Sequence, residues 1–303
     1  MQSDIIVLGG GPAGMTAAIY CSLAGNKTTM FEKSVCGGQM RNAEMIENYP
    51  GFCDISGTAL SENMKMQVLK SNAEIKNDEI VQLRKDKDNV LCLTKNSAFT
   101  AKAVIVAVGS KRRKLGLEEE EKFIGRGISY CALCDGNFFR NKTVAVIGSG
   151  SSAASEALHL AEICSKVYII LRSEKMKCTD SLLKSITQHK NIEIINNSSV
   201  FKINGDTVVE SIIIYNQVSK TYSTIYIKGL FISIGTVPCT ENFSNFLSCD
   251  KNGYIITDKD FQTSAKGIFA CGDCTTALHQ ITTATGSATY AATNACRYIK
   301  SDR

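Results

Sequence analysis

Two glycine-rich turns, each between an apolar strand and a helix, constrain the fold of this chain more than any other feature. The first turn occupies residues 9–14 (GGGPAG) and follows the apolar run at residues 5–8. Gly9 permits a tight turn, Gly11 lets the backbone approach a pyrophosphate, and Gly14 lets the helix pack against the sheet. The helix N-terminus adds unpaired N–H groups and a positive dipole end, which attract phosphate. The pattern predicts a dinucleotide-binding βαβ unit.

An acidic residue in the expected place supports this interpretation. The helix after the turn is expected to end near Gly25, and residues 28–31 form the next expected strand, with Glu32 at its tip. A carboxylate about 20 residues after the turn accepts hydrogen bonds from ribose hydroxyl groups. A glycine motif alone is a weak signal, but here strand, turn, helix, strand and acid occur in order. The unit therefore predicts a nucleotide site that also includes Pro12 and Ala13.

A second unit of the same kind begins midway along the chain. Its apolar strand, residues 143–147, leads into the turn GSGSSA at residues 148–153, and a helix and another strand follow. The tip of that strand carries Arg172 and Ser173 where a carboxylate is expected. This pair suits a 2′-phosphate better than a free hydroxyl group, which favours NADPH over NADH. The alternative interpretation is a unit that keeps the fold and binds no nucleotide.

Two βαβ units in 303 residues predict an α/β protein with two Rossmann-like dinucleotide-binding domains. The usual pairing is a resident flavin with a nicotinamide that binds and leaves. Hydrophobic residues make up 44% of the chain and charged residues 21%, as in a typical globular protein. The net charge of +5 is small, and the basic run at residues 111–114 is interpreted as a solvated turn or a contact for an acidic partner. We therefore expect no nucleic-acid partner.

A pair of cysteines lies between the two units. Cys131 and Cys134 have the spacing that closes a small disulfide ring, in which one thiol attacks a partner's disulfide and the other resolves the intermediate. Asp135 follows directly and can carry protons during this exchange. Tetrahedral zinc would need a second ligand pair. The other pair, Cys271 and Cys274, lies far along the chain, so we expect no metal. Because this pair flanks a turn after an apolar strand, we expect it to be structural, with an accessory redox role as the alternative.

The chain shows no sign of export or membrane insertion. No stretch approaches the ~20 continuous apolar residues that cross a bilayer, and the N-terminus lacks a signal-peptide pattern. We expect a cytoplasmic protein without membrane contacts. The 13 cysteines are too irregularly placed for a secreted disulfide framework. Most of them are expected to behave as small buried apolar residues, for example Cys21, Cys92, Cys164 and Cys296.

The motifs closely resemble those of the low-molecular-weight thioredoxin reductases, and the resemblance runs nearly end to end. The matching segments, in chain order, are GGGPAG at residues 9–14, CGGQ at 36–39, ENYPG at 47–51, AVGS at 107–110, CALCDG at 131–136, IGTVP at 234–238, ACGD at 270–273, HQ at 279–280 and the small-residue helix at 284–295. Each segment is a modest signal alone, and together they are specific. All three prolines, Pro12, Pro50 and Pro238, lie inside them.

The resemblance implies a flavin domain in two pieces, residues 1–113 and 243–303. A nicotinamide domain, residues 114–242, is inserted between them and carries the dithiol. Hinges are expected near residues 111–116 and 240–244, because in similar enzymes the inserted domain rotates. A homodimer is also implied.

The resemblance also assigns site residues. Those assigned to FAD are Gly9, Gly11, Pro12, Ala13, Gly14, Glu32, Gly38, Gln39, Asn48, Gly109, Gly272, Asp273, His279 and Gln280. Those assigned to NADPH are Gly148, Gly150, Ser151, Ser152, Ala153, Arg172, Ser173 and Lys177. Electrons would run from NADPH to FAD, then to Cys131–Cys134, with Cys134 on the flavin side, and finally to the disulfide of thioredoxin or a similar protein.

The nicotinamide site departs from the family pattern. The family reads approximately HRRxxxR, whereas residues 171–177 read LRSEKMK. Lys binds phosphate as a point charge where Arg binds it through two hydrogen bonds. Losing two charge-assisted contacts costs about 1.5–3 kcal/mol each. One alternative to an NADPH-dependent thioredoxin reductase is therefore an enzyme with the same dithiol that receives electrons from NADH or ferredoxin. Two others are a flavin-dependent dithiol oxidase and a non-catalytic flavin-binding module. His279 stands where the family has Arg, which leaves the flavin potential open.

Overall fold

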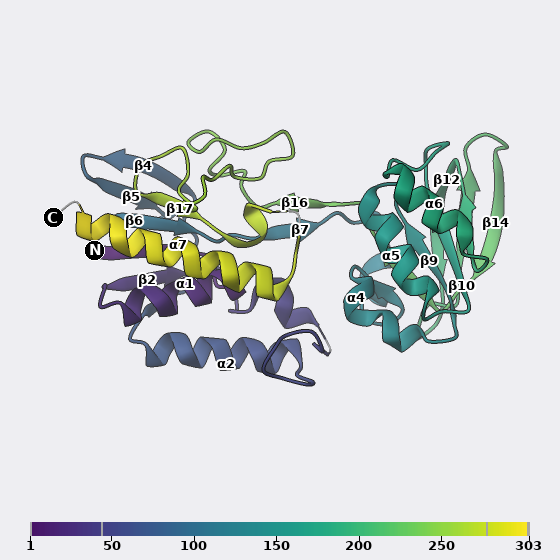
Figure 1. The fold of residues 1–303 in the computed structure, drawn as a ribbon, viewed down its shortest axis with the longest axis horizontal. Coiled ribbons are helices and arrows are strands. Elements are labelled where there is room, and N and C mark those ends of the chain that lie inside the picture. Colours follow the sequence, from purple (N-terminus) through teal and green to yellow (C-terminus); the bar gives the residue numbers. More distant parts are fainter. Residues whose placement is uncertain (1, 44, 277, 302–303) are drawn as a thin grey trace. The chain divides into compact units, whose positions relative to one another are not determined.

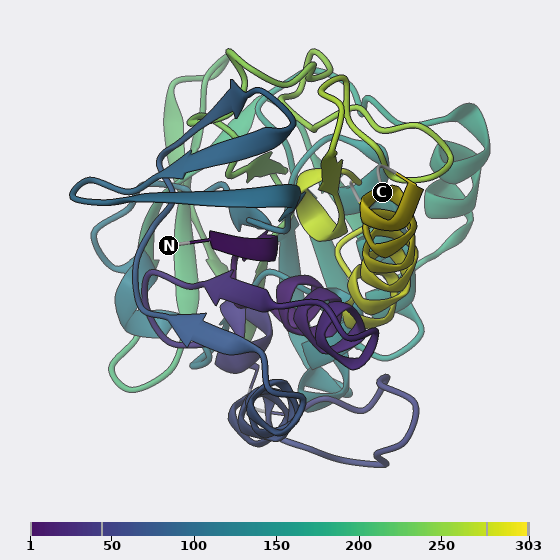
Figure 2. The same ribbon diagram turned by 90° about the vertical axis from the view of Figure 1, so that its left-hand side faces the viewer.

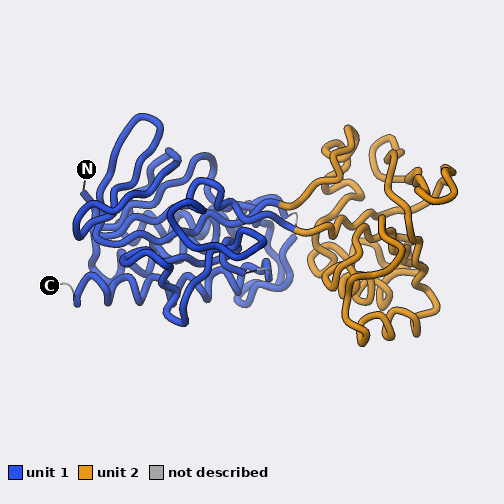
Figure 3. The backbone as a smooth tube through the Cα atoms, turned by 90° about the horizontal axis from the view of Figure 1, so that it is seen from above, with its two compact units in different colours: residues 1–111, 236–303 blue, residues 112–235 orange. Residues whose placement is uncertain are grey.

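The computed structural model describes residues 2–43, 45–276 and 278–301. The chain folds into two units, one formed by residues 1–111 and 236–303 and the other by residues 112–235 (Figure 3). The second unit is thus inserted into the first. The boundaries expected from the sequence, 113/114 and 242/243, lie two and seven residues further along the chain.

Paired strands mark both crossings between the units. β7 (Ser110–Arg112) pairs with β16 (Thr236–Pro238), and the Arg113 N–H donates to the Gly235 carbonyl at 3.0 Å. The outgoing and returning segments therefore run as one hydrogen-bonded ribbon. The first expected hinge, residues 111–116, begins in this ribbon, whereas the second, residues 240–244, follows β16 within unit 1.

A seven-stranded sheet forms the centre of unit 1 (Figure 1). In spatial order its strands are β3 (Glu74–Lys76), β2 (Thr28–Phe31), β1 (Gln2–Leu8), β6 (Ala98–Val106), β5 (Asn89–Leu93) and β4 (Gln82–Asp86), with β17 (Ile268–Ala270) also paired to β6. The first four strands and β17 are parallel, whereas β6, β5 and β4 are antiparallel neighbours. Ile5 and Val7 of β1 join one hydrophobic core, while Ile6 and Leu8 join the other. Burial on both faces explains why residues 5–8 of this strand are all apolar.

Three helices cover one face of this sheet. They are α1 (Pro12–Leu23), α2 (Gly57–Lys70) and α7 (Ile281–Ser301), and the short turns η1 (Gly38–Asn42) and η3 (Gly272–Cys274) complete the unit. α1 and α7 lie side by side in both views (Figures 1 and 2). Ala17 and Ala18 of α1 and Ala288 and Ala292 of α7 are fully buried in one core. These small side chains let the two helices approach closely.

Unit 2 is built on a five-stranded parallel sheet. In spatial order its strands are β11 (Ile192–Ile195), β10 (Lys166–Ile170), β9 (Thr143–Ile147), β15 (Gly229–Ile232) and β8 (Ile128–Ser129). A separate antiparallel sheet contains β12 (Ser198–Asn204), β13 (Ser211–Asn216) and β14 (Thr221–Tyr226). The helical segments are α3 (Glu120–Phe123), α4 (Ala132–Asp135), η2 (Gly136–Phe139), α5 (Ser151–Ala161) and α6 (Asp180–Gln188).

Each unit contains the βαβ arrangement that the sequence predicts. In unit 1 the parallel pair β1 and β2 is joined by α1, and in unit 2 the parallel pair β9 and β10 is joined by α5. The predicted α/β fold with two Rossmann-like units is confirmed. Within the described part of the chain, every helix is too short or too polar to cross a membrane.

Candidate redox and dinucleotide sites

The first glycine turn is fixed by contacts that exclude larger residues. Gly9 has a φ of +104°, and a Cβ on Gly14 would lie 1.8 Å from the Gly9 carbonyl oxygen. The start of α1 therefore packs directly on the turn. Gly11 is the N-cap of α1, Pro12 occupies its first position, and no side chain caps this end. Its first-turn N–H groups remain available for an anion.

Space beside the turn fits a pyrophosphate. A Cβ added to Gly11 would come within 4.0 Å of one atom, the Cα of Gly38. The backbone at Gly11 thus borders open space at the positive end of α1. This space, together with the uncapped N–H groups, satisfies the requirements of a dinucleotide that binds through its phosphates.

Glu32 lies at the end of β2, where the sequence places a ribose acceptor. Its Oε2 accepts from the Gly10 N–H at 2.7 Å, and its Oε1 accepts from the Ser34 N–H at 2.9 Å. Two backbone donors therefore hold the carboxylate beside the turn. Oε1 also accepts from the Ser34 hydroxyl at 3.3 Å, whereas Oε2 keeps a lone pair that can accept from a ribose hydroxyl group.

Three segments distant in sequence meet at one edge of the unit 1 sheet. β1, β6 and β17 are parallel, so the segments that follow them share the carboxyl edge, which is where α/β sheets bind ligands. The Gly272 N–H donates to the Ser287 hydroxyl of α7 at 3.0 Å, which anchors η3. The predicted residues gathered along this edge are Gly9, Gly11, Pro12, Ala13, Gly14, Gly38, Gly109, Gly272 and Asp273.

Four other predicted FAD residues come from loops of unit 1. The Gln39 amide donates to the Ser110 carbonyl, and the Asn48 amide donates to Gln280 Oε1 at 3.1 Å. The His279 ring packs against Tyr254, with 6.4 Å between ring centroids. Asn48 and Gln280 thus contact each other although they are 232 residues apart in the sequence. Sequence reasoning assigned no role to Ser287 or Tyr254, since no local pattern distinguishes them.

The second turn has the same layout in unit 2. Gly150 is the N-cap of α5, no side chain caps that end, and a Cβ on Gly150 would meet nothing within 4 Å. The other predicted residues surround this helix start: Gly148, Ser151, Ser152 and Ala153. Both serines are exposed, and Ala153 is buried. The position again combines uncapped N–H groups with open space, and it fits the phosphates of a second dinucleotide.

The segment at residues 171–177 returns to this turn. The Lys177 N–H donates to the Ser149 carbonyl, so Lys177 lies beside the turn itself. β10 ends at Ile170, and Arg172 follows after one further residue, Leu171. The Ser173 hydroxyl donates to the Lys175 carbonyl at 2.8 Å. The backbone of Lys177 thus lies beside the turn, whereas the Ser173 hydroxyl is turned toward its own backbone.

Glu156 of α5 is a titratable residue that the sequence analysis did not single out. Burial raises its pKa to about 7, although the positive charge of Arg112 and a hydrogen bond with Ser233 both oppose that rise. Its Oε2 is buried without a hydrogen-bond partner. In the sequence, Glu156 is distinguished only as a single carboxylate on the helix that follows the second glycine turn.

Cys131 and Cys134 form a disulfide at the start of α4. Their Cα atoms are 5.3 Å apart, and the Cys134 N–H donates to Cys131 Sγ at 3.2 Å. Both cysteines are half-buried, while Leu133 between them is 58% exposed. A partly exposed disulfide at a helix N-terminus is open to thiol–disulfide exchange.

A buried serine organises the groups around this disulfide. The Ser129 hydroxyl donates to Asp135 Oδ2 at 2.6 Å and accepts from the Cys131 N–H at 3.0 Å. Asp135 is therefore oriented by a group that also fixes the backbone of Cys131. Sequence reasoning missed Ser129, whose only signal is its position two residues before the first cysteine.

Cys271 and Cys274 are free thiols, fully buried at the end of β17. The Cys274 thiol donates to the Cys271 carbonyl at 3.2 Å, and burial raises its pKa to about 12. These properties match the structural role expected of the pair. Among the described residues, no group of three or more His, Cys, Asp or Glu side chains is arranged to hold a metal.

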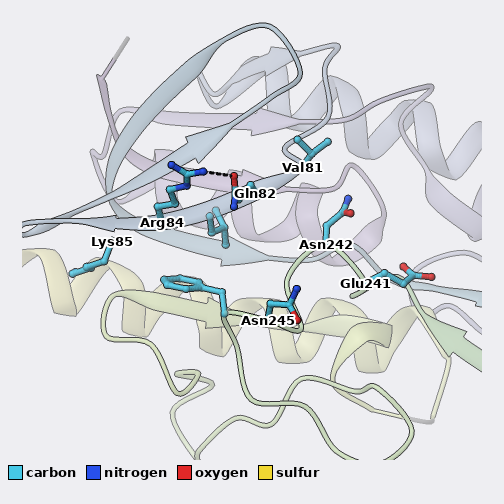
Figure 4. Close-up of a pocket in the computed structure, with 9 residues that line it drawn as sticks. Val81, Gln82, Arg84, Lys85, Glu241, Asn242 and Asn245 are labelled. Atoms are coloured by element: carbon cyan, nitrogen blue, oxygen red, sulfur yellow. Dashed lines mark hydrogen bonds between the residues drawn. The ribbon is translucent and has the colours of Figure 1, made fainter.

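A groove of about 550 Å³ runs along the edge strand β4 (Figure 4). Gln82, Arg84 and Lys85 line one side, and Glu241, Asn242 and Asn245 line the other. The Arg84 guanidinium donates to Gln82 Oε1 at 3.0 Å. None of the predicted site residues lines this groove.

Comparison with known proteins supports the resemblance seen in the sequence. The pyridine nucleotide-disulphide oxidoreductase family matches residues 3–288. A thioredoxin reductase of Listeria innocua is 39% identical over 299 residues, covering 98% of this chain and 94% of the relative. A thioredoxin reductase of Bacillus subtilis is 37% identical over 299 residues, covering 98% and 95%. The solved thioredoxin reductase of Streptococcus pyogenes has a TM-score of 0.92 at 36% identity and covers 99% of each chain.

The similarity spans both units and includes the inserted segment. It extends nearly end to end, as the ordered motifs indicate. The chain therefore belongs to the pyridine nucleotide-disulphide oxidoreductase family and, within it, to the thioredoxin reductases.

Proposed function

We propose that the chain is an NADPH-dependent thioredoxin reductase. Electrons pass from NADPH to FAD, then to the Cys131–Cys134 disulfide, and from the resulting dithiol to the disulfide of thioredoxin. The observation that carries this proposal is the partly exposed disulfide at the start of α4, in a chain with two dinucleotide turns that fit phosphates.

The FAD site is proposed to lie at the carboxyl edge of the unit 1 sheet. The uncapped start of α1 binds the pyrophosphate, and Glu32 accepts from the ribose. Gln39, Asn48, Asp273, His279 and Gln280 complete the contacts that the family resemblance implies. A bound flavin supplies the electron pair that opens the Cys131–Cys134 disulfide.

The dithiol then exchanges with the partner. The thiolate of Cys131 attacks one sulfur of the thioredoxin disulfide, and a mixed disulfide forms while the other thioredoxin sulfur leaves. Asp135, oriented by Ser129, donates the proton to that leaving thiolate. Cys134 gives its proton to Asp135 and attacks the Cys131 sulfur, which breaks the bond to thioredoxin and re-forms the internal disulfide. The second thioredoxin sulfur leaves as a thiolate that takes a proton from solvent. The assignment of Cys134 to the flavin side follows the family resemblance.

The electron donor is proposed to be NADPH. Arg172 and Lys177 supply two positive groups beside the second turn, which suits a 2′-phosphate. The Ser173 hydroxyl donates a hydrogen bond to the Lys175 carbonyl, so only two of the three expected side chains are left for the 2′-phosphate. The second candidate function is therefore an enzyme that discriminates less strongly against NADH.

Anaerobic mixing of the yellow holoenzyme with each nucleotide tests this assignment. We expect NADPH to bleach the visible flavin band rapidly and NADH to do so more slowly. Equal rates would support relaxed donor use. If neither nucleotide bleaches the flavin while dithionite does, the nicotinamide route is wrong and another donor, such as ferredoxin, takes its place.

We further propose a homodimer in a reducing compartment, the cytoplasm. The 11 cysteines outside the redox pair are free thiols, which suits a compartment that keeps thiols reduced. Light scattering during size-exclusion chromatography tests the dimer, which is expected to have twice the mass of the 32.9 kDa chain.

A further inference from the structure

Two cysteines from opposite ends of the chain meet between α1 and α7. Cys21 lies near the end of α1 and is fully buried, and Cys296 lies in the last part of α7 and is 7% exposed. Both cysteines belong to one hydrophobic core, and the Asn26 amide donates to the Cys21 carbonyl at 3.2 Å. The Asn26 amide also donates to Cys296 Sγ at 3.2 Å. Both thiols are buried as the sequence predicts, but they form a polar pair within the packing of two helices.

Cys296 opens into a pocket. This pocket measures about 270 Å³ and is lined by Tyr20, Ala24, Thr293, Cys296, Arg297 and Lys300. Its wall carries two cationic side chains and no acidic one. An aromatic ring beside two positive charges suits a small anionic molecule with some apolar surface. The pocket thus gives such a molecule a route to the sulfur of Cys296.

The surroundings divide the two thiols into a nucleophile and a resolving partner. A hydrogen bond from Cys21 lowers the pKa of Cys296 against the effect of its burial, and the charge of Lys300 adds to that lowering. The same hydrogen bond, together with burial, raises the pKa of Cys21. The thiolate is the reactive form of cysteine, so Cys296 reacts first.

We propose that Cys296 and Cys21 form a second thiol site, separate from Cys131–Cys134, that reacts with anionic low-molecular-weight disulfides. The Cys296 thiolate attacks one sulfur, the S–S bond of the small disulfide breaks, and one half leaves as a thiolate. Cys21 then loses its proton and attacks the Cys296 sulfur, which expels the second half. The small disulfide is reduced to two thiols, and the two cysteines are oxidised to a disulfide that joins α1 to α7.

Thiol mapping of the holoenzyme tests this site without an electron donor or thioredoxin, so its outcome is independent of the proposed function. The oxidised enzyme is treated with dithiobis(nitrobenzoate), a dianionic aromatic disulfide, and modified positions are located by tandem mass spectrometry. A Cys53→Ser background removes the one exposed free thiol. We expect a mixed disulfide at Cys296 first and a Cys21–Cys296 disulfide later.

Variants separate the two steps. Cys21→Ser is expected to stop at the mixed disulfide on Cys296, and Cys296→Ser to leave Cys21 unmodified. Cys92→Ser, which changes a fully buried thiol that does not line the pocket beside Cys296, is the matched control and leaves both products unchanged.

A charge test addresses the chemistry of the ligand. The rate at which Cys296 reacts is measured with dithiobis(nitrobenzoate) and with neutral dithiodipyridine. Lys300→Gln is expected to lower the ratio of the first rate to the second about fivefold, the effect of one nearby charge in water. The proposal is overturned if Cys296 stays unmodified in the folded wild type, if Cys92 reacts as fast as Cys296, or if the ratio does not change in Lys300→Gln.

Discussion

At the scale of single residues, one hydrogen bond from Ser129 holds Asp135 next to the Cys131–Cys134 disulfide. Cys131, Cys134 and Asp135 stand out because of their spacing. Ser129 does not, because its role depends on a hydrogen bond that appears only when α4 folds back on β8. Glu156 was missed for a similar reason, since its burial depends on residues of distant segments.

The Ser129–Asp135 hydrogen bond makes a prediction about proton transfer. In Ser129→Ala, Asp135 loses the donor that orients it, so the turnover of thioredoxin reduction is expected to fall about tenfold. Bleaching of the flavin by NADPH should be unaffected, because it precedes the exchange. Ser129→Thr keeps the hydroxyl group and should retain most of the activity. An equal loss in both variants would point to packing instead of the hydrogen bond.

The raised pKa of Glu156 makes a prediction about stability. The folded state holds the proton up to about pH 7, whereas the unfolded chain releases it near the ordinary value of 4.5, so the stability contributed by this group falls as the pH rises through that window. Glu156→Gln is therefore expected to raise the free energy of unfolding relative to wild type at pH 8, by on the order of 2 kcal/mol, and much less at pH 5.

Urea unfolding at the two pH values measures this difference. Glu162→Gln, at the exposed end of the same helix, serves as the control and should show little change. A Glu156→Gln variant that is equally destabilised at both pH values would contradict the assignment, since it would mean that the charged carboxylate stabilises the fold.

At the scale of elements, the two strand–turn–helix–strand units could be predicted because each is encoded within about 30 contiguous residues. The antiparallel sheet β12–β14 and the pairing of β17 with β6 were not predicted. The partners of β17 are more than 150 residues away in sequence, and no local pattern specifies such a pairing.

The packing of α1 on its turn predicts the effect of a single methyl group. Gly14→Ala would place a Cβ 1.8 Å from the Gly9 carbonyl oxygen, so α1 must move away from the turn. We expect the variant to purify with little bound flavin, as judged by the ratio of visible to ultraviolet absorbance. Gly286→Ala in α7 is the matched control, because its Cβ would meet nothing within 4 Å. It should keep its flavin and be as stable as wild type or slightly more so. Full flavin retention in Gly14→Ala would contradict the proposed phosphate site.

At the scale of the whole molecule, the family resemblance implied that one domain is inserted in another, and the structure divides the chain in that way. The exact crossings were not foreseen, because they depend on the pairing of β7 with β16, two short strands more than 120 residues apart. The Cys21–Cys296 pair was also invisible in the sequence, since it arises from the packing of the first helix on the last.

The proposed function requires that electrons leave the enzyme through Cys131–Cys134. The most direct measurement is NADPH-driven reduction of thioredoxin by wild type and Cys134→Ser, with flavin bleaching by NADPH recorded on the same samples. We expect wild type to reduce thioredoxin, whereas the variant should still bind its flavin and show flavin bleaching but reduce no thioredoxin. Thioredoxin reduction by Cys134→Ser at the wild-type rate would contradict the proposed function, because the electrons would then bypass the disulfide.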